Sequence, residues 1–355
     1  MDQVDVATPW LTPQVLGQDH AKTHFYQSVI AGRLGHGWLF TGPRGVGKMT
    51  YALLLARAVL NAGPPKNETE LAAGFQSESG HLVSRGVHPD LRVVALSEEE
   101  GAKHSIDVEQ IRELKAFFTR SAGRSQWRVA IIDSIDDMTR QAVNALLKLL
   151  EEPPDYCLIL IINHNAGRVI DTIRSRCQRL SFIAPNQELA VDILSNLLPQ
   201  SDAQTRAAAV YLAQGSVGRA VDMVHHGGLA LFETIMSLLS SRGNQSISEL
   251  HRFCESVSRR DQSEQFTLFV TLLRDWIYRL ARHQSDHSGF QPLFANEQEL
   301  ADVLTQQVEP DALYACWHKL GEISQETQTF NLDKKQAALS CFKAVRDLMP
   351  MAKAI

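Results

Sequence analysis

The chain has 355 residues, of which 44% are hydrophobic and 21% charged, and its formal net charge is −5 at pH 7. This composition is typical of a globular protein with two or three domains, and the negative charge argues against a protein that coats nucleic acid through bulk positive charge. The amino terminus lacks a signal-peptide pattern, and no apolar run reaches the ~20 residues of a membrane span. We therefore expect a cytoplasmic protein without a membrane segment.

The five cysteines are scattered along the chain, with no C-x-x-C pair. Such spacing favours a reducing compartment and predicts neither a disulfide framework nor a zinc site.

The first half of the sequence alternates helical patterns with short apolar strands. The predicted strands span residues 38–41, 90–96, 128–133, 157–162 and 180–183, and the predicted helices span residues 19–32, 49–60, 106–120 and 138–152. Residues 61–89 are rich in Gly, Pro and Ser, which predicts an irregular connection with at most a short helix near residues 68–75. Apolar strands between helices indicate a parallel α/β sheet covered on both faces, with ligands at the carboxyl ends of its strands.

The second half has only helical patterns. The predicted helices span residues 188–198, 202–213, 216–225, 232–239, 247–258, 263–282, 297–303, 311–327 and 334–349. We predict three domains: an α/β domain over residues 1–184, a small helical lid over residues 185–228, and a C-terminal all-α bundle over residues 229–355.

A phosphate-binding loop is predicted between the first strand and the next helix. Gly42, Gly45, Gly47 and Lys48 fit the pattern G-x-x-x-x-G-K, whose backbone N–H groups and lysine bind nucleotide phosphates. The alternative is a glycine-rich turn without a ligand. The next position normally carries Ser or Thr to bind Mg²⁺, but here it is Met49, a soft ligand that Mg²⁺ does not favour. ATP or ADP could bind this loop, but we expect no efficient hydrolysis.

The strand at residues 128–133 carries the second part of this site. It ends in Asp133, where a hydrolysing enzyme of this kind holds its metal ion. The next residue should be a glutamate that activates water, but here it is Ser134, and we interpret Asp136 and Asp137 as a solvated helix start. The two departures, at residues 49 and 134, predict a site that is not catalytic.

Three motifs give the chain a family resemblance. The run NALLKLLEEPP (residues 144–154), the run RSRC (residues 174–177) and the run LFTGPRGVGK (residues 39–48) are similar to bacterial clamp-loader subunits of the AAA+ class. The defective nucleotide site favours the delta-prime branch of this family over the ATP-hydrolysing tau/gamma branch. The resemblance implies an AAA+ domain, a lid and a helical collar within a hetero-oligomeric ring.

The resemblance also implies roles for individual residues. In this family the Ser-Arg-Cys motif, here Ser175, Arg176 and Cys177, supplies an arginine finger to ATP on the neighbouring subunit. Taken alone, Arg176 would read as a surface arginine that caps the preceding helix. Asn163 matches a polar sensor of the γ-phosphate. The second sensor arginine of active relatives aligns with Gly218, and Arg219 lies one residue further on, so we expect this sensor to be missing.

The resemblance further implies a non-hydrolysing subunit of the DNA polymerase III clamp loader, which helps load the sliding clamp onto primed DNA. Its implied partners are the tau/gamma and delta subunits. The alternative is an ATP-hydrolysing tau/gamma-like motor subunit; an unrelated nucleotide kinase would leave the LLEEPP and SRC motifs unexplained. We expect no required cofactor and no zinc, because residues 61–89, where relatives carry a four-cysteine module, contain no cysteine.

Overall fold

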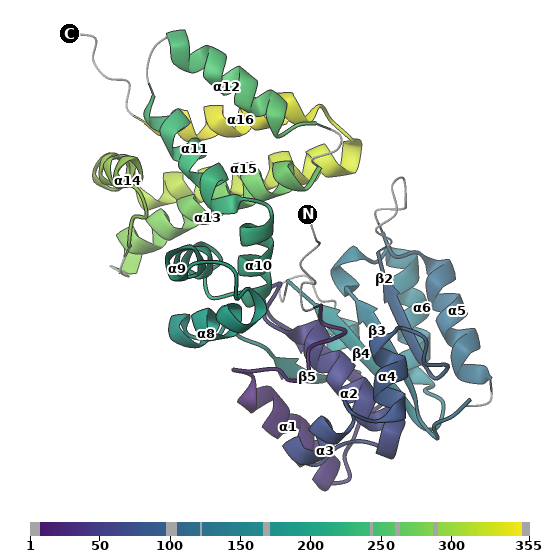
Figure 1. Ribbon diagram of the computed structural model, residues 1–355. Coiled ribbons are helices and arrows are strands. Elements are labelled where there is room, and N and C mark those ends of the chain that lie inside the picture. Colours follow the sequence, from purple (N-terminus) through teal and green to yellow (C-terminus); the bar gives the residue numbers. More distant parts are fainter. Residues whose placement is uncertain are drawn as a thin grey trace. The chain divides into compact units, whose positions relative to one another are not determined.

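A computed structural model describes residues 8–96, 105–120, 123–165, 171–241, 244–259, 263–286 and 290–349. It divides into two compact units, Met1–Pro199 with Gly215–Arg219, and Gln200–Gln214 with Ala220–Ile355 (Figure 1). The strands of the first unit are β1 (Gly37–Thr41), β2 (Leu91–Ala95), β3 (Arg128–Asp133), β4 (Cys157–Asn163) and β5 (Gln178–Ser181). Its helices are α1 (Asp19–Ile30), α2 (Lys48–Ala62), α3 (Glu68–Ala73), α4 (Glu78–Ser84), α5 (Val108–Thr119), the 3-10 turn η1 (Ile135–Asp137), α6 (Arg140–Glu151), α7 (Asp171–Arg174) and α8 (Gln187–Leu197).

The five strands form one parallel sheet in the order β2-β3-β4-β1-β5. In the register of this sheet Thr41 pairs with Asn163, so the ends of β1 and β4 lie side by side. β3 lies on the other side of β4 and ends at Asp133. The loop after β1 and the polar residues that end β3 and β4 therefore meet at the carboxyl edge of the sheet.

Successive side chains along a strand point alternately into two hydrophobic layers, one on each face of the sheet. On β1, Trp38 and Phe40 pack in the layer under α1 and α2, whereas Leu39 packs in the opposite layer under α5 and α6. This period of two follows from the pleat of a strand, and it leaves both faces of the sheet buried. Figure 1 shows helices on both sides of the sheet. The α/β fold class predicted from the sequence is confirmed.

The connection at residues 61–89 holds more helix than its composition predicts. The expected short helix is present as α3, but α4 is a second one, capped by the Ser77 hydroxyl, which accepts the Gly80 N–H. Both helices pack on α2, and a Cβ at Gly74 would lie 2.6 Å from the backbone nitrogen of Ala58. The buried guanidinium of Arg57 stacks on Phe75 and donates to the Ser84 hydroxyl. Glycine and serine usually indicate a loop, but here Gly74 allows close packing of two backbones and Ser77 caps α4.

The described secondary-structure elements of the second unit are all helices. The unit contains α9 (Ala203–Leu212), most of α10 (Val217–His225), α11 (Gly228–Ser240), α12 (Asn244–Ser256), α13 (Ser263–Asp286), α14 (Ala295–Gln307), α15 (Pro310–Phe330) and α16 (Lys334–Arg346). The long helices α13 and α15 pack along each other, and α16 packs on α15. In the described part of the chain, no helix is long and apolar enough to cross a membrane. The division into three domains stays a prediction.

Candidate functional site

The loop after β1 has the backbone of a phosphate loop. Gly42, Gly45 and Gly47 have φ values of 150°, 79° and 94°, which side chains with a Cβ rarely adopt. A Cβ at Gly42 would also lie 2.1 Å from the Phe182 carbonyl oxygen, so glycine is required there on steric grounds. Met49 is half-buried and packs against the hydrophobic layer beneath α2. It therefore belongs to the core and offers no oxygen ligand.

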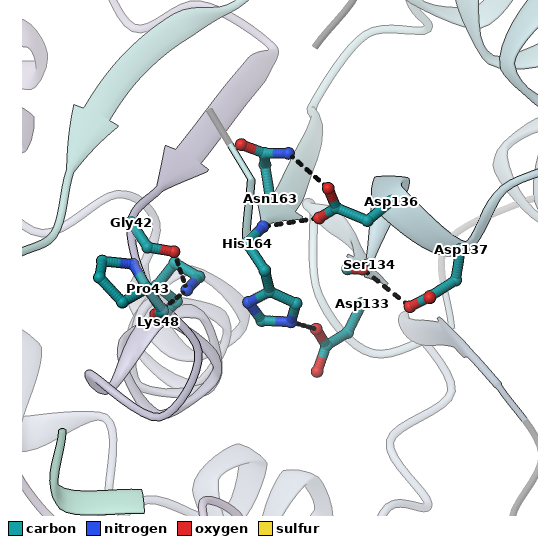
Figure 2. Close-up of polar contacts among 9 residues, drawn as sticks. All are labelled: Gly42, Pro43, Lys48, Asp133, Ser134, Asp136, Asp137, Asn163 and His164. Carbon is teal, nitrogen blue, oxygen red and sulfur yellow. Dashed lines mark hydrogen bonds and ion pairs between the residues drawn. The ribbon is translucent and has the colours of Figure 1, made fainter. Parts of the chain in front are cut away.

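Lys48, the first residue of α2, is turned back onto its own loop. Its ammonium donates to the carbonyl oxygens of Gly42 at 2.7 Å and Pro43 at 2.5 Å (Figure 2). The residue is 3% exposed, and burial lowers the pKa of its ammonium to about 8, although the Asp133 and Asp136 carboxylates act in the opposite direction. The group that would contact the outer phosphates is thus engaged by backbone oxygens.

Asp133, at the end of β3, faces a histidine. Its Oδ1 lies 3.5 Å from Nε2 of His164, the residue that follows β4. The next residue, Ser134, is 1% exposed, and its hydroxyl donates to Asp137 at 2.8 Å (Figure 2). A hydroxyl in this position cannot serve as a general base in the manner of a glutamate.

Asn163 is buried at 1% exposure and is also engaged within the chain. Its two amide N–H groups donate to Asp136 Oδ1 at 3.1 Å and to the Asn165 carbonyl oxygen at 3.2 Å. The other oxygen of Asp136 accepts the His164 backbone N–H at 2.6 Å. An amide nitrogen has only two hydrogens, so Asn163 in this arrangement has none left for a γ-phosphate.

Residues 215–219, which belong to the first unit, lie against the phosphate loop. The Ser216 hydroxyl donates to the Arg44 carbonyl oxygen at 2.7 Å, and the Gly218 N–H donates to the Gly45 carbonyl oxygen at 2.8 Å. A Cβ at Gly218 would lie 2.8 Å from Gly45 Cα. A sensor arginine at position 218 is therefore incompatible with this contact.

Arg176 lies at the opposite, amino edge of the sheet. Its carbonyl oxygen would be 3.5 Å from a Cβ at Gly37, the first residue of β1, whereas the phosphate loop begins after Thr41, the last residue of that strand. At ~3.3 Å per residue the two ends of the strand are about 13 Å apart. Arg176 is therefore too far away to act on this chain's own phosphate loop.

The side chain of Arg176 is 35% exposed and has defined partners. Its Nη2 pairs with Glu151 Oε1 at 2.7 Å, and its Nη1 donates to the Thr172 carbonyl oxygen at 3.0 Å and the Ser175 hydroxyl at 3.3 Å. Cys177 packs beside Gly37, and burial raises the pKa of its thiol to about 12. Cys177 is thus a packing residue with a protonated thiol, and Ser175 supports the arginine.

The structure brings the predicted residues together at two separate edges. Gly42, Gly45, Gly47, Lys48, Asp133 and Asn163 meet at the carboxyl edge, whereas Ser175, Arg176 and Cys177 lie at the amino edge. Sequence reasoning missed His164 and Glu151, although the first directly follows the sensor position and the second lies within LLEEPP. It also interpreted Asp136 and Asp137 as a solvated helix start, whereas both are partly buried and accept hydrogen bonds within the chain. Within the described ranges, no three His, Cys, Asp or Glu side chains gather closely enough to hold a metal ion.

Comparison with known proteins gives one consistent family. Residues 17–186 match the family described as "DNA polymerase III, delta subunit". The chain is similar to "DNA polymerase III subunit delta'" of Pseudomonas aeruginosa, at 33% identity over 53% of this chain and 56% of the relative. It is 34% identical to the Bacillus subtilis protein of the same description, over 56% of each chain.

Another relative is "DNA polymerase III subunit gamma/tau" of Mycobacterium bovis, at 34% identity over 48% of this chain and 28% of that protein. The chain thus spans about half the length of the delta-prime relatives that it matches. The resemblance drawn from the LFTGPRGVGK, LLEEPP and SRC motifs is confirmed by these matches. Residues 17–186 of this chain therefore resemble the family described as "DNA polymerase III, delta subunit" and its delta-prime relatives.

Proposed function

We propose that this chain is a non-hydrolysing subunit of the DNA polymerase III clamp-loader complex. It would help load the sliding clamp onto primed DNA and supply Arg176 in trans to ATP on a neighbouring subunit. Its partners would be the tau/gamma and delta subunits, in keeping with relatives described as DNA polymerase III subunits. It would need no cofactor, and any ATP or ADP in its own loop would stay unhydrolysed.

The position of Arg176 carries this proposal. Its guanidinium is partly exposed at the sheet edge remote from the chain's own phosphate loop, which supports a role toward a phosphate on another molecule. A cation placed beside a γ-phosphate stabilises the charge of the transition state, and such fingers are worth about 10³–10⁵ in rate. The state of the chain's own loop supports the same reading, because Met49, Ser134, the engaged Lys48 and the engaged Asn163 each lack a function needed for hydrolysis.

Arg176→Ala in a complex reconstituted with tau/gamma and delta tests the trans role. We expect clamp- and DNA-stimulated ATP hydrolysis to fall, since the neighbouring site would lose its finger, while the complex still assembles. Arg174→Ala is the matched control, because Arg174 is also exposed but pairs with Asp171. If the Arg176→Ala complex hydrolyses ATP at the wild-type rate, the trans role is wrong.

The second candidate is an ATP-hydrolysing motor subunit. The full G-x-x-x-x-G-K spacing and the 34% identity to a gamma/tau subunit favour it. The two candidates differ in the isolated chain: a motor subunit would show Mg²⁺-dependent ATP turnover that Lys48→Ala abolishes, whereas the non-hydrolysing subunit would show none.

A further inference from the structure

Glu151 is the carboxylate that faces Arg176. It is the last residue of α6, it lies in the LLEEPP motif, and its Oε1 is 2.7 Å from Arg176 Nη2. We propose that Glu151 is a positioning residue for Arg176: it holds the guanidinium in a fixed orientation at the amino edge, ready to meet a phosphate on a neighbouring subunit. This inference rests on the proposed trans role of Arg176.

The location of Glu151 on its helix indicates that the pairing matters. A helix C-terminus carries a partial negative charge, which disfavours carboxylates and favours cations. α6 nevertheless ends in Glu151, and Glu152 follows it. A guanidinium beside Glu151 offsets this unfavourable position.

The backbone segments that bear Glu151 and Arg176 are held in place relative to each other by neighbouring contacts. The His36 ring hydrogen-bonds the Leu150 carbonyl oxygen at 2.8 Å, which ties the end of α6 to the start of β1. A Cβ at Gly37 would lie 2.9 Å from the Leu150 side chain and 3.1 Å from Cys177 Sγ. The residues next to Glu151 and next to Arg176 therefore pack on the same glycine, so the distance between the two side chains is set by the core.

The contacts of Arg176 leave part of its guanidinium available. The group has five N–H donors. Nη1 donates to the Thr172 carbonyl oxygen and to the Ser175 hydroxyl, which uses both of its hydrogens, whereas Nη2 forms an ion pair with Glu151. The N–H groups of Nε and Nη2 are the ones that could contact a phosphate. Because both terminal nitrogens are already held, less side-chain freedom is lost when the neighbour docks.

The expected effect is modest, because both side chains are partly exposed to solvent. Side-chain exposure is 35% for Arg176 and 48% for Glu151, and exposed ion pairs of this kind change equilibria by about 2–5-fold. The quantity to measure is the Arg176-dependent ATPase rate, defined as the wild-type rate minus the rate of the Arg176→Ala complex, in complexes reconstituted with tau/gamma and delta.

Glu151→Ala should lower kcat for the Arg176-dependent rate by about 2–5-fold, with little change in KM for ATP, because a finger acts on the transition state. Glu151→Gln keeps an acceptor oxygen for Nη2 and should retain more of the rate. Glu152→Ala, a change of the adjacent exposed carboxylate, is the matched control and should leave the rate unchanged. In the Arg176→Ala background, Glu151→Ala should have no further effect.

Three other results would contradict the inference that Glu151 positions Arg176. If Glu151→Ala leaves the Arg176-dependent rate unchanged, Glu151 does not position the finger, and the trans role itself still stands. If Glu151→Ala lowers the rate equally in the Arg176→Ala background, Glu151 acts by another route. If Arg176→Ala itself has no effect, there is no Arg176-dependent rate, and the proposed function and this inference are both wrong.

Discussion

Replacing Lys48 with methionine should remove a pH-dependent part of the stability of the first unit. Burial lowers the pKa of the Lys48 ammonium to about 8, against an ordinary value of 10.5. Between these two values the unfolded chain binds the Lys48 proton and the folded chain releases it. The free energy of unfolding therefore rises with pH across this window.

The size of the effect follows from the shift. A difference of about 2.5 pH units corresponds to roughly 3 kcal/mol for the whole window, and about 2 kcal/mol of this should appear between about pH 7 and pH 9.5. Methionine has a similar unbranched shape but no titrating group. The Lys48→Met protein should therefore lack this increase.

Urea unfolding at a series of pH values measures the effect. Other groups titrate over the same range, so the informative quantity is the difference in unfolding free energy between wild type and variant at each pH. Lys148→Met changes an exposed lysine on α6 and should leave the wild-type pH dependence intact. If the Lys48→Met protein gains as much stability with pH as wild type, the ammonium is not held in the buried position described here.

Three further predictions concern neighbouring features. Met49→Thr restores a hydroxyl at the magnesium position, but the isolated chain should still show no Mg²⁺-dependent phosphate release, because Ser134 cannot activate water; measurable turnover would contradict this. Gly218→Ala should destabilise the protein by about 1–3 kcal/mol in urea unfolding, because its Cβ would lie 2.8 Å from Gly45 Cα, and unchanged stability would show that the contact is dispensable. Asp90→Asn should cost about 1–3 kcal/mol at neutral pH, because the buried carboxylate accepts three backbone N–H groups at 2.6–2.9 Å, and an unchanged midpoint of urea unfolding would refute this.

The Asp90 variant also has an expected pH dependence. Burial alone would raise the pKa of Asp90, but the three backbone N–H groups more than compensate and hold the pKa below its ordinary value of 3.8. The stability contributed by this carboxylate is therefore present above that pH and is lost as the pH falls toward the lower folded-state pKa. The difference between wild type and variant should shrink in this acid range, and a constant difference would contradict the assignment.

Local sequence patterns were sufficient to predict the strands and the loop after β1. Each of the five predicted apolar runs overlaps a strand of the sheet, because a run such as residues 157–162 is stable only when both of its faces are buried. The run at residues 180–183 shares only residues 180 and 181 with β5 (Gln178–Ser181). The G-x-x-x-x-G-K spacing likewise specifies a turn with positive φ angles between a strand and a helix. The strands and this loop depend on residues that are close in the chain, so the order of residue types is enough to predict them.

The placement of the polar side chains depended on tertiary structure. Only the order of strands in the sheet brings His164 to Asp133 and Glu151 to Arg176, pairs that are 31 and 25 residues apart by their numbers. Periodicity does not encode such contacts, because hydrogen bonds between distant segments follow from the packing of the core. The sequence alone therefore predicted a degenerate phosphate loop and an arginine of interest. The parallel sheet decided that the two lie at opposite edges, and the proposed role of Arg176 toward another molecule rests on that separation.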